Sequence, residues 1–195
     1  MVIRAMTEAD AAEVSALMRR SYDRVLVHYH SPEMLAHFRE HATPESLTEQ
    51  LGRKEVVVVA DAAGRIVATG GLGWFDDPDA PREDQAAVCE AAANRRVSNL
   101  FVAVDLIGRG IGRALLDHLV RLAEAEGARR LHVASSRNAV NFYQRAGFTV
   151  DPAPPSGIPE VTWLVMELFA EDGRGMARPL TRPVNDAPSG GPSKT

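Results

Sequence analysis

The chain has 195 residues, of which 45% are hydrophobic and 25% charged, the balance of an ordinary globular protein with one core. The single cysteine, Cys89, excludes an internal disulfide framework and disfavours a cysteine-built zinc site. A formal net charge of -4 disfavours nucleic acid and anionic membranes as main partners, and no apolar run is long enough to span a bilayer.

The two ends of the chain carry signals of location and of domain extent. The first residues lack the apolar segment of a signal peptide, so we expect a cytoplasmic protein. At the other end, residues 171–195 contain four prolines and four glycines but few large apolar side chains. Such a composition buries too little surface to offset the entropy lost on ordering. We therefore expect one folded domain over residues 1–170 and a flexible tail over residues 171–195.

Helix signals come first in chain order. Asp10 stands three residues after Thr7, an acidic variant of the capping box, and an apolar stripe at helical spacing follows. A capping hydroxyl before a proline occurs twice more and predicts two short helices. A β-branched run, a turn and a second extended run then predict a hairpin. The short helices are expected near Ser31–His41 and Thr43–Leu51, and the hairpin strands over Glu55–Asp61 and Arg65–Gly71.

The second half alternates strands and helices after a long acidic connection over Trp74–Asn94, part of which, Gln85–Ala93, has a helical pattern. Its best helix, Ile111–Glu126, has one apolar face and stops at Gly127. This alternation predicts an α/β (α+β) arrangement around a mixed sheet. The other expected elements are strands over Val97–Val104, Leu131–Ala134 and Val161–Leu168, a glycine-rich turn over Gly108–Gly112 and a helix over Arg137–Ala146.

The segment from Asn99 to Leu116 is the most informative, because it runs from a buried strand through a glycine-rich loop into the best helix. The first amides of a helix have no intrahelical partner, and the helix dipole adds partial positive charge there. The glycines of Gly108–Gly112 let a phosphate approach the main chain, and Arg109 and Arg113 add charge at the rim. The segment therefore predicts an anion cradle suited to a pyrophosphate.

Two common nucleotide-binding motifs fit this loop poorly. A P-loop requires Lys-Ser or Lys-Thr after its glycines, and none follows here. A Rossmann fingerprint requires G-x-G-x-x-G and an acidic residue at the end of the next strand. The spacing here is G-x-G-x-G, and the next strand ends at Ala134-Ser135-Ser136.

Two motifs in the second half resemble those of the GNAT superfamily of N-acetyltransferases. The run G-R-G-I-G-R-A-L-L over Gly108–Leu116 is similar to that family's acetyl-CoA pyrophosphate loop. The run S-S-R-N-A-V-N-F-Y-Q-R-A-G-F over Ser135–Phe148 is similar to the family's N-x-x-A-x-x-F-Y-x-x-x-G-F ending. Ser136 stands where the family has its Asn, and Asn138 lies two residues later. The motifs follow in the family's order, and the resemblance is sharp over Asn99–Phe148.

The resemblance implies a mixed, mostly antiparallel central sheet flanked by helices, acetyl-CoA as cosubstrate, no metal, and direct transfer to an amine. The strand Val97–Val102 is expected to leave its neighbour after a bulge and to pair with the pantetheine arm. An amide near Phe101 or Val102 would polarise the thioester carbonyl, and Tyr143 would protonate the departing thiolate. The residues implied in cofactor binding are Leu100, Phe101, Val102, Val104, Gly108, Arg109, Gly110, Ile111, Gly112, Arg113, Ser136, Asn138 and Phe142.

The acceptor and the general base stay open at this point. The acceptor is expected to be a primary amine of a small molecule or peptide, and the resemblance also allows a homodimer. Candidate bases are His28, Tyr29 and His30, between the first helices, and Asp76 and Asp77, after the hairpin. The acidic connection that contains the two aspartates would favour a cationic amine.

Other classes of function compete with this interpretation. The main alternative is a non-catalytic domain that binds acyl-CoA or another nucleotide as a sensor. His37-Phe38-Arg39-Glu40-His41 fits the inverted zincin pattern H-x-x-E-H, but no matching acidic ligand stands out downstream. Cys89 has no histidine nearby in sequence, which disfavours a cysteine nucleophile.

Overall fold

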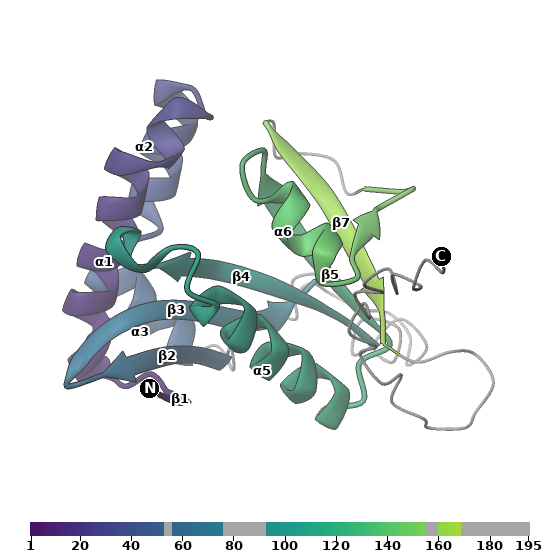
Figure 1. The fold of residues 1–195 in the computed structure, drawn as a ribbon, viewed down its shortest axis with the longest axis horizontal. Coiled ribbons are helices and arrows are strands. Elements are labelled where there is room, and N and C mark those ends of the chain that lie inside the picture. The colour runs from purple at the N-terminus through teal and green to yellow at the C-terminus, as the bar shows by residue number, and fades with distance from the viewer. Residues whose placement is uncertain (53–55, 76–92, 155–159, 169–195) are drawn as a thin grey trace, which may run out of the picture.

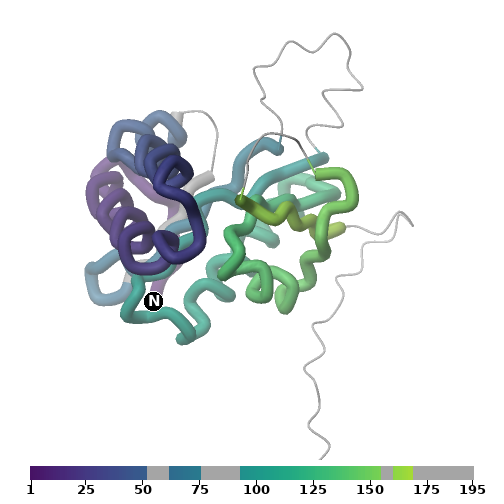
Figure 2. Tube along the Cα trace, turned by 90° about the horizontal axis from the view of Figure 1, so that it is seen from above, coloured from purple at the N-terminus to yellow at the C-terminus, as the bar shows by residue number. Residues whose placement is uncertain are grey.

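A seven-stranded sheet with helices on both faces organises the described part of the molecule (Figure 1). The computed structural model describes residues 1–52, 56–75, 93–154 and 160–168. Seen from above, the N-terminal helices gather on one side and the later elements on the other (Figure 2). The helices are η1 (Glu8–Asp10), α1 (Ala11–Arg24), η2 (Leu26–His28), α2 (Pro32–Glu40), α3 (Pro44–Gly52), η3 (Val104–Leu106), α5 (Ile111–Ala125) and α6 (Val140–Arg145). The strands are β1 (Val2–Ala5), β2 (Val56–Ala62), β3 (Arg65–Trp74), β4 (Asn94–Val102), β5 (Arg130–Ser136), β6 (Thr149–Val150) and β7 (Val161–Glu167).

The sheet is mixed and mostly antiparallel, as predicted. Its strand order is β1-β2-β3-β4-β5-β7-β6. Every neighbouring pair runs antiparallel except β4 and β5, which are parallel. Because parallel strands need a long crossover connection, the helix α5 carries the chain from β4 to β5.

Two apolar clusters hold the helices to the sheet. The first packs α5, through Leu115 and Leu119, against sheet residues that include Val97. The second packs the N-terminal helices around residues such as Leu17 and Tyr22. Leu115 and Leu119 are fully buried, so the apolar face that the sequence shows for this helix is the face that packs on the sheet.

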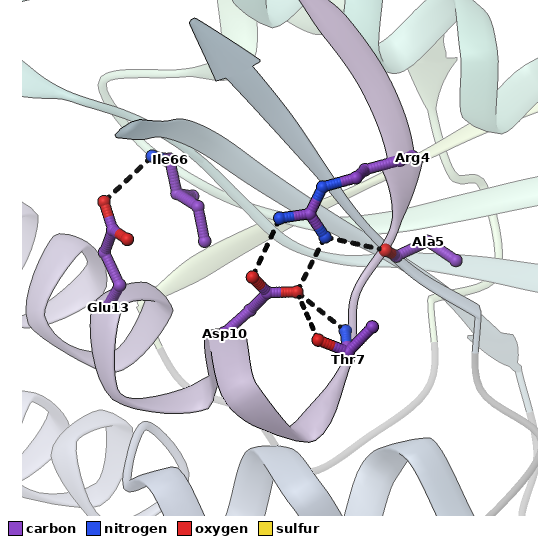
Figure 3. A network of polar contacts seen from close by, with 6 residues as sticks. All are labelled: Arg4, Ala5, Thr7, Asp10, Glu13 and Ile66. Atoms are coloured by element: carbon purple, nitrogen blue, oxygen red, sulfur yellow. Dashed lines mark hydrogen bonds and ion pairs between the residues drawn. The ribbon is translucent and has the colours of Figure 1, made fainter. Parts of the chain in front are cut away.

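The N-terminus is anchored by the predicted capping residues (Figure 3). Asp10 accepts hydrogen bonds from the Thr7 backbone N–H and hydroxyl, both at 2.8 Å, and pairs with the Arg4 guanidinium at 2.7 Å. Glu13 accepts the backbone N–H of Ile66 at 2.9 Å and ties α1 to β3. The capping box opens the short turn η1 rather than α1 itself, because α1 begins one residue after Asp10.

The short helices and the hairpin also appear where the sequence predicts them. The Ser31 hydroxyl accepts the backbone N–H of Met34 at 3.3 Å at the start of α2. The Thr43 hydroxyl accepts that of Ser46 at 3.1 Å at the start of α3. Each proline therefore occupies the first helical position after its cap.

Several boundaries differ from the sequence prediction. The strands β1 and β6 were not predicted, because they are short and have no clear alternation of polar and apolar residues. The strand β4 begins at Asn94 rather than Val97 and ends at Val102, so Val104 lies in η3. The helix α6 begins at Val140 because the preceding residues form a turn, closed by the Ala139 N–H on the Ser136 carbonyl at 2.9 Å.

Four sequence predictions fall outside the described residues. They are the candidate bases Asp76 and Asp77, the helical pattern over Gln85–Ala93, of which Ala93 alone is described, the thiol of Cys89, and the tail over residues 171–195. The domain boundary near residue 170 therefore stays a prediction.

Candidate active site

The parallel strands β4 and β5 separate partway along their length, as predicted. Their pairing runs from Asn94 opposite Arg130 to Val97 opposite Val133 and stops there. The strand β5 stays paired with β7 up to Ser136. Figure 1 shows β7 rising away from β4 on the far side of this opening. The β4–β5 opening, as we call this gap beyond Val97 and Val133, leaves one edge of β4 without a strand partner among the described residues.

A β-bulge on β4 lies where the opening begins, again as predicted. Ser98 pairs with Gly71 and Phe101 with Thr69, so two residues of β4 face one residue of β3. Asn99 adopts a left-handed backbone with φ 51°, and its side-chain amide donates to Gln50 of α3 at 2.9 Å. The extra residue shifts the alternation of β4 by one position.

This shift decides which side chains of β4 face which cluster. Leu100 and Val102 pack on the α5 cluster, whereas Phe101 packs on the N-terminal cluster with its ring 5.4 Å from that of Tyr22. The predicted contribution of Phe101 to cofactor binding is therefore limited to its main chain. Because the Ala103 N–H donates to Val67 of β3 at 2.8 Å, strand alternation turns the Val102 N–H toward the open edge.

The glycine loop after β4 exposes the beginning of α5. Gly108 and Gly110 have φ of 84° and 81°, and no neighbouring atom lies within 4 Å of a Cβ built on either. The first backbone bond of α5 runs from the Ala114 N–H to the Gly110 carbonyl at 3.0 Å. The amides of Ile111, Gly112 and the next residue therefore have no acceptor within the helix, which leaves the predicted anion cradle in place.

The two loop arginines differ in how they are held. Arg109 is exposed on the loop. Arg113 lies on the first turn of α5, where its Nε donates to Asp117 at 2.8 Å and its guanidinium reaches the Arg145 carbonyl of α6 at 3.3 Å. Arg113 therefore links α5 to the end of α6. Arg109 is the arginine that is better placed to pair with the negative charge of a phosphate.

The helix α6 packs directly against the first turn of α5. A Cβ on Gly112 would lie 3.2 Å from Val102 and 3.7 Å from the Phe142 ring, so glycine permits this close approach. Phe142 and Tyr143 are neighbours with their ring centroids 5.0 Å apart, and Tyr143 packs edge-on against Phe148 at 5.5 Å. The F-Y and G-F parts of the motif thus form one aromatic cluster beside the anion cradle.

Tyr143 is 5% exposed and belongs to the α5 cluster. Burial raises the pKa of its hydroxyl well above the ordinary tyrosine value of 10.0. The described residues give this hydroxyl no hydrogen-bond partner. A tyrosine that stays protonated at neutral pH can donate a proton or a hydrogen bond but cannot act as a base.

Ser136 and Asn138 lie together at the end of β5. The Ser136 hydroxyl donates to the Asn138 side-chain oxygen at 2.6 Å, in an exposed position. The sequence left open which of the two contacts the cofactor, and the structure shows them as one hydrogen-bonded pair.

The candidate bases are placed very differently from one another. His28 and Tyr29 are exposed, whereas His30 is buried, and Asp76 and Asp77 lie outside the described residues. Both ring nitrogens of His30 are enclosed without a hydrogen-bond partner in the part of the chain that is described.

Glu160, which the sequence analysis missed, lies beside His30. One of its carboxylate oxygens is 3.4 Å from His30 Nδ1 and accepts the Ser31 N–H at 2.8 Å. No sequence signal marks Glu160, since its partners lie more than a hundred residues earlier.

A second buried histidine lies in the paired part of β5, just before the opening begins. His132, next to Val133, contacts Asp151 at 3.1 Å and Asn94 at 3.3 Å, and the Phe75 ring stacks on it at 3.8 Å. Burial lowers the pKa of His132, and the hydrogen bond and charge of Asp151 oppose this. The His132–Asp151 contact therefore links β5 to the residue that directly follows β6.

Two further findings concern metals and membranes. His37 and His41 of the H-x-x-E-H pattern lie with ring centroids 4.7 Å apart, but within the described ranges no group of three His, Cys, Asp or Glu side chains could hold a metal ion. Among the same residues, no helix is both long and apolar enough to cross a membrane.

Comparisons with solved structures show the fold. The PaiA N-acetyltransferase from Thermoplasma acidophilum, in complex with coenzyme A, has a TM-score of 0.68 at 15% identity, covering 85% of this chain and 98% of that one. The putative acetyltransferase YncA from Salmonella typhimurium, with its cofactor acetyl-CoA, has a TM-score of 0.61 at 17% identity, covering 91% and 99%. An N-acetyltransferase from Staphylococcus aureus Mu50 has a TM-score of 0.62 at 16% identity, covering 86% and 98%.

Sequence comparison extends this from the fold to the family. No curated protein matches the chain. The family model described as "Acetyltransferase (GNAT) domain" matches residues 26–168, which include both walls of the β4–β5 opening, the glycine loop and α6. The chain therefore belongs to the GNAT acetyltransferase family and is an acyltransferase.

Proposed function

We propose that this protein is an acetyl-CoA-dependent N-acetyltransferase that moves an acetyl group directly to a primary amine of a small molecule or peptide. The observation that carries the proposal is the open edge of β4, which leads through the glycine loop into the exposed first turn of α5. The extended, amide-rich pantetheine arm of acetyl-CoA fits the open edge of β4, and its pyrophosphate fits the first turn of α5. The proposal places the activity in one domain over residues 1–170, in the cytoplasm, without a metal.

The residues that would hold acetyl-CoA contribute mainly their backbone. The open edge of β4 at Leu100 and Val102 would pair with the pantetheine arm. The amides at the start of α5, from Ile111 onward, would hold the pyrophosphate, with Arg109 adding charge. Ser136 and Asn138 would contact the cofactor from the second wall, and the acetyl thioester supplies the group to be transferred.

Two groups of this chain would perform the chemistry. The Val102 N–H, turned toward the open edge, would donate to the carbonyl oxygen of the thioester as negative charge develops on it. The acceptor amine first loses its extra proton to solvent water, and its neutral nitrogen then bonds to the carbonyl carbon. The carbon–sulfur bond breaks, and the nitrogen gives a second proton to water to leave the amide. Tyr143, whose ring lies beside Phe142 next to the first turn of α5, would donate its hydroxyl proton to the departing thiolate. The mild charge balance of the chain is compatible with small acceptors.

The first experiment separates a catalyst from a sensor. Coenzyme A and acetyl-CoA should raise the melting temperature of the full chain, and NAD, as a control, should not. Release of free thiol from acetyl-CoA is then measured across a panel of primary amines. Release with at least one amine is the expected result. Stabilisation by coenzyme A without release for any amine would favour the non-catalytic acyl-CoA-binding domain.

A further inference from the structure

Glu160 joins the two walls of the β4–β5 opening. It directly precedes Val161, which pairs with Ser136 at the end of the β5–β7 wall. Its carboxylate accepts the backbone N–H of Ser31, the residue that caps α2, at 2.8 Å. Figure 1 shows α2 and the beginning of β7 reaching the same end of the molecule on two sides of the opening. The carboxylate therefore lies where the beginning of β7 meets the cap of α2, and we call this place the mouth of the opening.

His30 supplies a second, independent observation at the same place. Its side chain is fully buried, and neither ring nitrogen has a hydrogen-bond partner among the described residues. Enclosing an imidazole without hydrogen bonds is costly, so a buried ring of this kind calls for a functional explanation. Glu160 is the carboxylate beside it, with 3.4 Å between Nδ1 and the nearer oxygen.

The Glu160 carboxylate is fixed by a hydrogen bond, charged and accessible to solvent. A glutamate carboxyl group is ionised at neutral pH, and the hydrogen bond from the Ser31 amide lowers its pKa further. Its backbone has φ 63°, a left-handed conformation that is unfavourable for a glutamate and that persists only where the surroundings enforce it. A third of its side chain is exposed, which leaves room for a ligand.

The charge of this group indicates which substrate it meets. Coenzyme A carries several negatively charged phosphates. We expect them to bind at the N-terminal, positive end of α5 with Arg109. A fixed carboxylate repels that cosubstrate and attracts a cation. The cation in the proposed reaction is the acceptor. Because its reacting nitrogen must be neutral to attack the thioester, the charge that meets Glu160 belongs to a second cationic group of the same molecule.

Resting on the proposed function, we propose that Glu160 is a substrate-binding residue that holds a positively charged group of the acceptor. His30 and Ser31 are positioning residues, which act by keeping the Glu160 carboxylate at the mouth of the opening. The acceptors are therefore amines that carry a second cationic group, such as diamines. The hydrogen bond from the Ser31 N–H orients the Glu160 carboxylate before the acceptor binds.

The test compares putrescine with butylamine, which differ by one amino group. Binding of each to the full chain loaded with coenzyme A is measured by calorimetry, and thiol release from acetyl-CoA is measured in parallel. In the Glu160→Gln variant we expect putrescine to bind about tenfold more weakly, the usual effect of losing one charged hydrogen bond, with butylamine and acetyl-CoA unaffected. The control variant is Glu167→Gln, which removes an exposed carboxylate of the same strand that pairs with Arg130 instead.

The role of His30 is tested by a double variant. His30→Gln should weaken putrescine binding by less than Glu160→Gln does. The two substitutions together should weaken it no further than Glu160→Gln alone, since His30 acts through the carboxylate. Additive losses would show that His30 does not act through Glu160 and would overturn its positioning role.

The outcomes separate this inference from the proposed function. Equal putrescine binding by the unsubstituted chain and Glu160→Gln overturns the inference, even if the protein acetylates amines. Binding that depends on Glu160 without thiol release sustains the inference and contradicts the proposed function. Absence of binding by any cationic amine overturns the inference. Should Glu160→Gln fail to fold, Glu160→Asp, which retains the charge but shortens the side chain, tests the position of the carboxylate instead. Weaker binding of putrescine with butylamine unaffected would support the inference, and unchanged binding of both would overturn it.

Discussion

The two ends of the β4–β5 opening are built from different kinds of chemical group. Where the cosubstrate is expected, the site consists of main-chain amides on the edge of β4 and on the first turn of α5. At the mouth, the site that we propose consists of the Glu160 carboxylate with His30 beside it. The Ser31–Glu160 hydrogen bond at this place joins residues 129 positions apart in the chain. The first end depends on backbone conformation, and the second depends on which side chains the fold brings together.

This difference explains why one end is recognisable and the other is not. A backbone site needs glycines at fixed spacing on one continuous segment, so it leaves a pattern in the sequence. A site made of two distant side chains leaves no such pattern. It follows that substitutions which disturb the backbone should dominate at the cosubstrate end, and substitutions of charge should dominate at the mouth.

The largest expected effect concerns Tyr143, the side chain that we propose takes part in the chemistry at the cosubstrate end. Tyr143→Phe removes a hydroxyl but keeps the ring that packs on Phe148. We expect kcat for acetyl transfer to fall about 100-fold, the usual contribution of a general acid, with the affinity for coenzyme A unchanged. The control is Tyr22→Phe, which removes a buried hydroxyl in the other cluster. A kcat unchanged by Tyr143→Phe would remove Tyr143 from the mechanism.

The second prediction tests whether the cosubstrate end depends on backbone conformation. Gly110 and Gly127 flank the same helix, with φ of 81° and 78° and open space around both. Alanine at either position should cost about 1–2 kcal/mol of folding free energy because of the left-handed backbone. Only Gly110→Ala should also weaken coenzyme A binding, by about fivefold, because it distorts the anion cradle. Calorimetric titration measures this, and equal affinities in the two variants would contradict a backbone-built site.

The third prediction concerns the anchoring of the N-terminal helices. The Arg4 guanidinium and the Thr7 hydrogen bonds hold the pKa of Asp10 well below its ordinary value of 3.8. Asp10→Asn should therefore cost about 1 kcal/mol at pH 7. The unsubstituted protein has this stabilisation above pH 3.8 and loses it as the pH falls toward the folded-state pKa. The difference between the two denaturation curves should accordingly shrink below pH 4, and a difference independent of pH would contradict the ion pair.

The smallest effect is expected from the exposed side chains of the cosubstrate end. Ser136 and Asn138 hydrogen-bond one another in an exposed position. Replacing either by alanine should change KM for acetyl-CoA by no more than about threefold, since an exposed hydrogen bond contributes little. Steady-state kinetics checks this. A tenfold increase would show that a side chain, rather than the main chain, holds the cosubstrate at that wall.

Most of the fold was predictable from local signals. The capped starts of α2 and α3, the apolar face of α5 and its stop at Gly127 are all properties of neighbouring residues. The short strands β1 and β6 were missed, because two to four residues at the margin of a sheet are stabilised by the strand beside them rather than by their own sequence. The boundaries of α6 and β4 also shifted, where a turn and a bulge competed with the pattern.

The sequence by itself determined the glycine loop, the helix that follows it and the aromatic motif, since each is a contiguous run whose chemistry is read from spacing. Only the tertiary structure decided how β4 is used. The bulge at Asn99 decided that Leu100 faces the α5 cluster and Phe101 the N-terminal cluster, and the end of pairing at Val97 opened one edge of the strand. Only the tertiary structure, too, brought Glu160 to His30. Contacts between distant residues depend on the summed geometry of the sheet, which no local pattern encodes.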